Sequence, residues 1–113
     1  MFNATPELIQ EFEAAGLTLI PEDATDSKTR VPCITYLEQG NSDYAIGNTI
    51  GYSDISYLIQ IWAQNEKTLT ALCADVDKIM KSLLFRRTSM NYQHINGLYR
   101  KILTYERIIK EHF

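Results

Sequence analysis

The stretch Ser53–Met80, SDISYLIQIWAQNEKTLTALCADVDKIM, changes its hydrophobic period half-way along. In the first half, every second residue is large and apolar, as in a strand with one buried face. These residues are Ile55, Tyr57, Ile59 and Ile61. Leu58 and Trp62 make the opposite side apolar as well. A strand with large apolar groups on both faces is usually buried on both, so the pattern predicts a central strand over residues 55–63.

The second half repeats with the spacing of an α-helix. Asn65 is a favoured N-cap residue, and Glu66 places a negative charge in the first turn. The apolar stripe that follows contains Leu69, Leu72, Cys73, Val76, Ile79, Met80 and Leu83. We expect a long helix that packs on the central strand through this stripe.

Before this stretch the sequence predicts a short helix, a loop and a strand. Thr5 can cap a helix with Pro6 at its first position, and Gly16 is a natural stop. Residues 21–30 are polar and aperiodic, which is typical of an exposed loop. Pro32 can only begin a strand or lie on an edge, and a β-rich run follows it.

Segment Gly40–Asp54 is rich in glycine and tyrosine. A hairpin with short arms and a turn at Gly47–Asn48 fits it, and a flexible loop fits it nearly as well. Its large side chains would be poorly buried on a lone hairpin, and they are Tyr44, Ile46, Ile50 and Tyr52. They are either plain sheet residues or candidate subunit-interface residues, since tyrosine is favoured at binding surfaces.

The tail contains the strongest hairpin signal of the chain, Asn96–Gly97. The run 98–110 fits one face of a helix and partly fits a strand; we favour a strand because the turn and the β-rich ILTY agree. The hairpin could gather a basic contact patch, although ordinary surface charge is the better explanation of its members: Arg86, Arg87, Arg100 and Lys101. Such a patch would suit an acidic partner or a nucleic-acid backbone.

The 113 residues suit one α+β domain, an antiparallel sheet packed by a short N-terminal helix and one long central helix. Its radius of gyration should be roughly 13 Å. The net charge of -3 argues against binding nucleic acid through overall charge. Because the N-terminus does not resemble a signal peptide and no apolar run reaches the ~20 residues of a membrane span, we expect assembly inside a cell and no membrane.

The residues that could carry chemistry form no recognisable constellation. His94 and His112 lack a second ligand at metal spacing, and the two cysteines suit buried free thiols. Asp75 and Asp77 do not share a helix face. No phosphate-binding or nucleophile motif is present. We therefore expect no enzyme activity, no metal and no cofactor.

Three short motifs carry a resemblance to a known family, and they are Pro32–Tyr36, Gln60–Ala63 and Tyr99–Lys101. Their order and surroundings over Val31–Glu106 resemble the small tail-completion and tail-terminator proteins of long-tailed bacteriophages and prophages. The likeness spans about two thirds of the chain, and its motifs are structural rather than catalytic.

The resemblance implies an α+β subunit that assembles as a ring, commonly a hexamer, at the head-proximal end of the tail tube. The ring would stop tube polymerisation, dock the head connector and let DNA pass. Its partners would be other copies of itself, the tail-tube protein and the head-connector protein, in a virion assembled in the bacterial host cytoplasm. The alternatives are a neck or head-completion protein and a small adaptor domain that binds a partner through a sheet edge.

Overall fold

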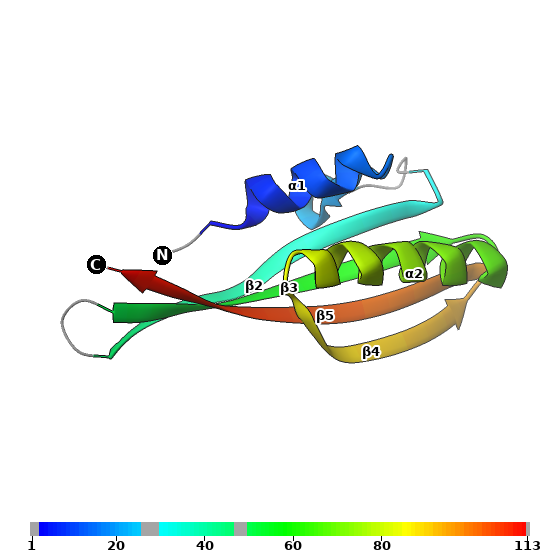
Figure 1. Cartoon of the computed structure of the whole chain (residues 1–113). Coiled ribbons are helices and arrows are strands. Elements are labelled where there is room, and N and C mark those ends of the chain that lie inside the picture. Colours follow the sequence, from blue (N-terminus) through cyan, green and yellow to red (C-terminus); the bar gives the residue numbers. More distant parts are fainter. Residues whose placement is uncertain (1–2, 26–29, 47–49, 113) are drawn as a thin grey trace.

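A computed structural model describes residues 3–25, 30–46 and 50–112, with side chains for these residues apart from 43–46, 50 and 111–112. The elements are helix α1 (Thr5–Ala14), strand β1 (Leu19–Pro21), 3₁₀ turn η1 (Glu22–Ala24), strands β2 (Cys33–Ile46) and β3 (Ile50–Ala63), helix α2 (Glu66–Ser82), and strands β4 (Arg86–Ile95) and β5 (Leu98–His112) (Figure 1). The chain forms a single α+β domain, as the sequence predicts.

The five strands lie in the order β1-β2-β3-β5-β4. The prediction of a central strand is confirmed, because β3 is the middle strand and is antiparallel to both neighbours. The prediction of a strand after Asn96–Gly97 is confirmed by β5. One part of the sheet differs from the expected antiparallel order, since the three-residue β1 is parallel to β2. Residues 22–24 of the predicted loop also form the 3₁₀ turn η1.

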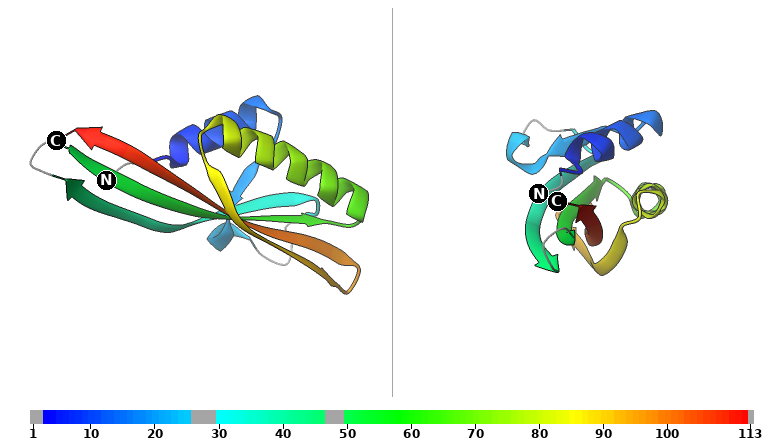
Figure 2. Two further views of the ribbon diagram at one scale, coloured as in Figure 1. Left: turned by 60° about the horizontal axis from the view of Figure 1, so that its bottom comes forward. Right: turned by 60° about the vertical axis from the view of Figure 1, so that its left-hand side comes forward.

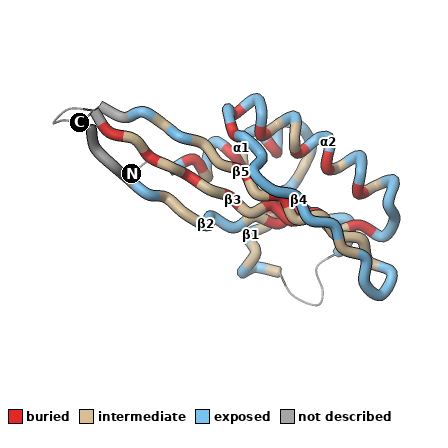
Figure 3. The backbone as a smooth tube through the Cα atoms, turned by 90° about the horizontal axis from the view of Figure 1, so that it is seen from below, coloured by how far each residue is buried: buried red, intermediate tan, exposed pale blue. Residues whose placement is uncertain are grey.

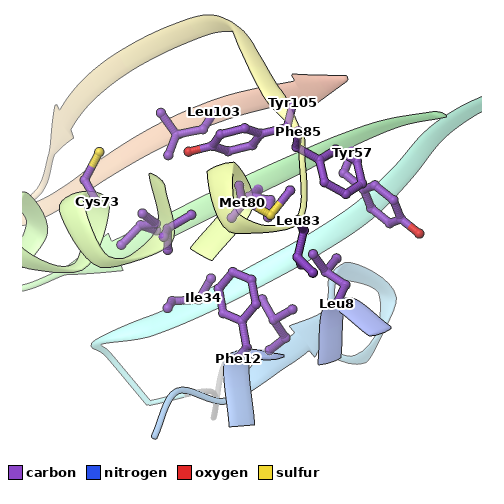
Figure 4. Packing of buried hydrophobic residues seen from close by; sticks show 14 of the residues in the cluster. Leu8, Phe12, Ile34, Tyr57, Cys73, Met80, Leu83, Phe85, Leu103 and Tyr105 are labelled. Carbon is purple, nitrogen blue, oxygen red and sulfur yellow. The ribbon is translucent and has the colours of Figure 1, made fainter. Parts of the chain in front are cut away.

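Both helices cover the same face of the sheet (Figure 2). Alternate residues of β3 are fully buried beneath them: Ile55, Tyr57, Ile59, Ile61 and Ala63. The predicted stripe of α2 supplies the other half of the core, with Leu69, Val76 and Met80 completely buried. Figure 4 shows Met80 and Cys73 of this stripe. Leu72 and Ile79 are only partly buried at the margin of this layer. The predicted cap is confirmed, since Asn65 Oδ1 accepts a 2.8 Å hydrogen bond from the Thr68 amide.

The start of α1 differs from the prediction. The N-cap position is Ala4, so Thr5 is not the cap. Asn3 Oδ1 accepts a 3.2 Å hydrogen bond from the Thr5 amide instead. The Thr5 hydroxyl lies 2.6 Å from the Tyr57 hydroxyl, and this bond fixes α1 to the centre of the sheet.

The described parts of segment 40–54 belong to the long strands β2 and β3. The two strands stay paired as far as Ile46 and Ile50, so the arms are longer than the short ones that we expected. The predicted turn at Gly47–Asn48 lies outside the described residues. Fourteen residues of β3 extend about 46 Å at ~3.3 Å each, whereas the 17 residues of α2 extend about 26 Å at ~1.5 Å each. The strands therefore pass beyond the helices as a twisted ribbon (Figures 1 and 2).

This ribbon changes the overall shape. The molecule measures 53 × 25 × 25 Å, and its radius of gyration is 15.4 Å. The predicted value of roughly 13 Å is too small because it assumes a compact shape for a chain of this length.

Candidate interaction surfaces

The side chains that could bind a metal or act as nucleophiles lie apart in the fold. Among the described residues, no three His, Cys, Asp or Glu side chains gather as a set of metal ligands. The His94 ring stacks on Tyr99 with 4.0 Å between ring centroids. Cys73 is buried and Cys33 half-buried, both as free thiols, and burial raises the pKa of Cys33. A thiol that stays protonated is a poor nucleophile, so packing best explains Cys33.

Asp77 is the centre of a cluster of polar side chains on the helix-covered face. Its Oδ1 accepts a 2.9 Å hydrogen bond from the Tyr105 hydroxyl and lies 3.5 Å from Arg87 Nη1. Its Oδ2 lies 3.4 Å from Lys81 Nζ. Burial, followed by the bond to Asp77, raises the pKa of Tyr105 well above the ordinary value. The cluster joins α2, β4 and β5, and its groups are engaged with one another.

The four predicted basic residues do not gather into one patch. Because β4 and β5 are antiparallel, Arg86 pairs with Glu106 at one end of the hairpin, and Arg100 pairs with Gln93 near the other. Six residues of β5 separate these positions, about 20 Å at ~3.4 Å per residue. Arg87 is also held by Asp77. The hairpin thus keeps the two pairs apart, and a shared contact by all four is not supported.

The predicted interface residues are brought together along the ribbon. Tyr44 pairs with Tyr52 and Ile46 pairs with Ile50 in the backbone register of β2 and β3. The side chains of Tyr44, Ile46 and Ile50 lie outside the described residues, and Tyr52 is half-buried. Ile108 of the adjoining β5 is 55% exposed. Ile108 pairs with Asp54, so its apolar side chain is presented on the sheet face opposite the helices.

The sheet face opposite the helices carries a second surface that the sequence did not suggest. The Arg100 guanidinium stacks over Trp62, with Cζ 4.7 Å from the ring centroid. Its Nη1 donates a 3.3 Å hydrogen bond to Gln60 Oε1, and its Nη2 donates to Gln93 Oε1. Gln60 in turn donates a 3.1 Å hydrogen bond to Glu22 of η1. These residues come from four separate elements and meet only through the sheet register, which no local sequence pattern reveals.

A shallow hollow of about 210 Å³ lies beside this network. It is lined by Trp62, Gln93, Ile95, Asn96, Leu98 and Arg100. Ile95 is 60% exposed at its rim, and Leu37 is 44% exposed further across the sheet. The hollow is open and mixed in character, so it suits a contact surface better than an enclosed ligand site.

Strand β4 forms an exposed edge of the sheet (Figure 3). Nine of its ten residues are exposed and the tenth is half-buried. Met90 and Tyr92, 49% and 47% exposed, share a face with the stacked His94 and Tyr99. Methionine and tyrosine are enriched at protein interfaces, so this edge combines an open main chain with suitable side chains.

A scan of known protein families finds no match, and a search of curated proteins finds none either. Among the helices of the described residues, none is long and apolar enough to span a membrane.

Proposed function

We propose that this protein is a structural virion-assembly subunit that forms a ring of identical copies, caps a tail tube and joins the tail to the head. The single observation that carries the proposal is the ribbon of β2, β3 and β5. It runs beyond the helices and gives a small domain a length of 53 Å (Figure 1). The sheet face opposite the helices also exposes apolar groups such as Ile108, which a neighbouring copy would cover.

The arrangement of the three family-like motifs supports the same proposal. Cys33 pairs with Trp62, and Trp62 pairs with Arg100, so the motifs lie side by side at one end of β2, β3 and β5. They form one continuous patch of sheet rather than three unrelated matches. The strand-to-helix passage at Asn65 then serves as scaffold, because α2 covers the same end of the sheet.

The exposed β4 edge favours one alternative, a small adaptor domain that binds the strand of an unrelated protein. A neck or head-completion protein is a variant of the main proposal that would bind the head connector alone. The three functions differ in which protein is bound, so binding partners separate them.

The test is a tube-capping assay. Tail-tube protein from a long-tailed phage is polymerised with and without this protein, and tube length and tube ends are examined by negative-stain electron microscopy. The proposal predicts shorter tubes that carry a ring at one end only. A Tyr44→Ser, Tyr52→Ser double variant should fold normally and fail to cap. Because phages differ, the tube protein and head connector should come from the genome that encodes this chain.

Unchanged tubes with no ring would refute the tube-capping function. Binding to the head connector without any binding to tubes would assign the neck function instead. A matched control is Thr70→Ser on the exposed surface of α2, far from the ribbon, which should cap as the wild type does.

A further inference from the structure

Two edges of the sheet are open to a further strand. β4 pairs only with β5. β2 pairs with β1 only at Ile34–Tyr36, so residues 37–46 are paired on the β3 side alone. Within the described residues, no other strand lies beside either edge. Each open edge is ten residues long, since β4 has ten residues and the open part of β2 has the same number.

The β4 edge lacks the features that usually block edge pairing. Natural edge strands carry lysine, proline or inward-pointing charges. Residues 88–93 contain none of these, and they read TSMNYQ. A bulge between Arg87 and Ser89 disturbs only the start of the strand, which leaves Ser89–Ile95 in regular register. Beyond this bulge, the regular and uncharged part of the edge is a site where a further strand can add.

The two open edges have opposite charge. β4 carries Arg86 and Arg87 and no acidic residue. Residues 37–46 carry Glu38 and Asp43 and no basic residue. Two β4 edges facing each other would bring four arginines to one interface, whereas β4 against β2 brings opposite charges together. The complement of the β4 edge is therefore present on a second copy of this chain.

Strand direction fits the same pairing. β2, β3, β5 and β4 alternate in direction, so β4 runs antiparallel to β2. A second copy added by rotation about an axis along the strands would keep these directions. Its β2 would then lie antiparallel to the β4 of the first copy. The contact is head to tail, which leaves one free edge at each end for the next copy.

The stagger of the two edges favours a closed ring. By register, β4 lies level with residues 33–40 of β2, where β1 already occupies Ile34–Tyr36. To bring residues 37–46 level with β4, the next copy must shift along the strand direction by about five residues, roughly 17 Å at ~3.3 Å each. Four strands at ~4.8 Å spacing span about 19 Å, so the shift tilts the strands by about 40°. Strands in closed barrels tilt by roughly 35–45°.

We infer that β4 of one copy adds antiparallel to residues 37–46 of β2 of a second copy, head to tail, so that the sheet continues from copy to copy. The inference rests on the proposed function, because the ring is the assembly that this function requires. It goes beyond that function by assigning the surfaces that meet.

A charge-swap experiment tests the pairing. The first variant carries Ser89→Glu and Asn91→Glu on β4, and the second carries Gln39→Lys and Ser42→Lys on β2. All four positions are exposed, so both variants should fold, which circular dichroism and thermal melting can verify. Assembly is measured by analytical ultracentrifugation of each variant and of an equimolar mixture.

Each variant alone should assemble about tenfold more weakly or worse, because the substitutions cancel the net charge of one edge and remove its attraction for the other. The mixture should regain the wild-type oligomer, since the introduced carboxylates then meet the introduced lysines and the two unsubstituted edges keep their opposite charges. The inference is overturned if either variant assembles as the wild type does, if the mixture fails to recover, or if the wild type stays monomeric. Dissociation of the β4 variant alone would indicate β4–β4 pairing. A successful swap by a protein that does not cap tubes would leave the edge pairing in place and refute the tube-capping function.

Discussion

The Tyr105 hydroxyl donates a 2.9 Å hydrogen bond to Asp77, which joins the last strand to the long helix. Tyr105 is fully buried in β5, and the Asp77 side chain is 20% exposed on α2. Because Asp77 also meets Arg87 of β4, one carboxylate connects three elements. This connection holds α2 against the middle of the sheet, where β4 begins.

Replacing this hydroxyl should cost a modest amount of stability. Tyr105→Phe keeps the ring and removes one hydrogen bond, so the free energy of unfolding should fall by about 1 kcal/mol. Urea titration measures the change. Tyr99→Phe is the matched control on the same strand, because the contact described for Tyr99 is ring stacking on His94. Equal effects of the two substitutions would show that the bond to Asp77 contributes nothing specific.

The same phenol should make the fold sensitive to alkali. The pKa of Tyr105 is raised above its ordinary value of 10.0, so the folded state keeps the proton after the unfolded chain has lost it. Its contribution is complete below about pH 10 and is lost as the pH rises above that value, by up to about 1.4 kcal/mol per pH unit. Urea titrations between about pH 9 and pH 11 should show a steeper loss for the wild type than for Tyr105→Phe. Parallel pH profiles would contradict this assignment.

Leu84→Gly should stabilise the protein. Leu84 has φ of +67° directly after α2, and it is 74% exposed. The Phe85 amide donates to Met80 O at 2.9 Å and the Leu84 amide to Lys81 O at 3.0 Å, which is a Schellman motif with leucine where glycine is favoured. Relief of the left-handed strain should raise the free energy of unfolding by about 1 kcal/mol. Leu84→Ala, which keeps the Cβ, should give no such gain in thermal melting.

Truncating residues of the apolar stripe of α2 to alanine should lower the free energy of unfolding by two different amounts, according to how deeply each side chain is buried. Leu69 is fully buried, so Leu69→Ala should cost about 2–5 kcal/mol. Leu72 is only partly buried, and Leu72→Ala should cost clearly less in the same denaturant titration. If Leu72→Ala lowers the free energy of unfolding as much as Leu69→Ala does, the Leu72 side chain must also be buried by a second copy of the chain.

Those elements that depend on local pattern could be predicted from the sequence. Periodicity predicted β3 and α2, Asn65 predicted the helix start, and Asn96–Gly97 predicted the β4–β5 hairpin. These signals lie within a few residues of the structure that they specify. β1 was missed, because three residues ending in Pro21 give no period and are held only by pairing with β2.

Those features that depend on the sheet register could not be predicted. The length of β2 was missed because residues 40–43, GNSD, lack apolar alternation and are strand only through pairing with β3. The contact of Arg100 with Trp62 joins residues on different strands and appears only once the register is known. For the same reason, the hairpin separates the arginines that the sequence suggested as one patch.

The central claim is that this chain works as a closed ring of identical subunits, and native mass spectrometry tests it most directly. The account predicts one dominant assembly whose mass is a fixed whole-number multiple of the 13.0 kDa chain, about six-fold for a hexamer, unchanged as concentration rises. A monomer at every concentration would contradict the account, and so would a ladder of sizes that grows with concentration, since that is the mark of an open filament.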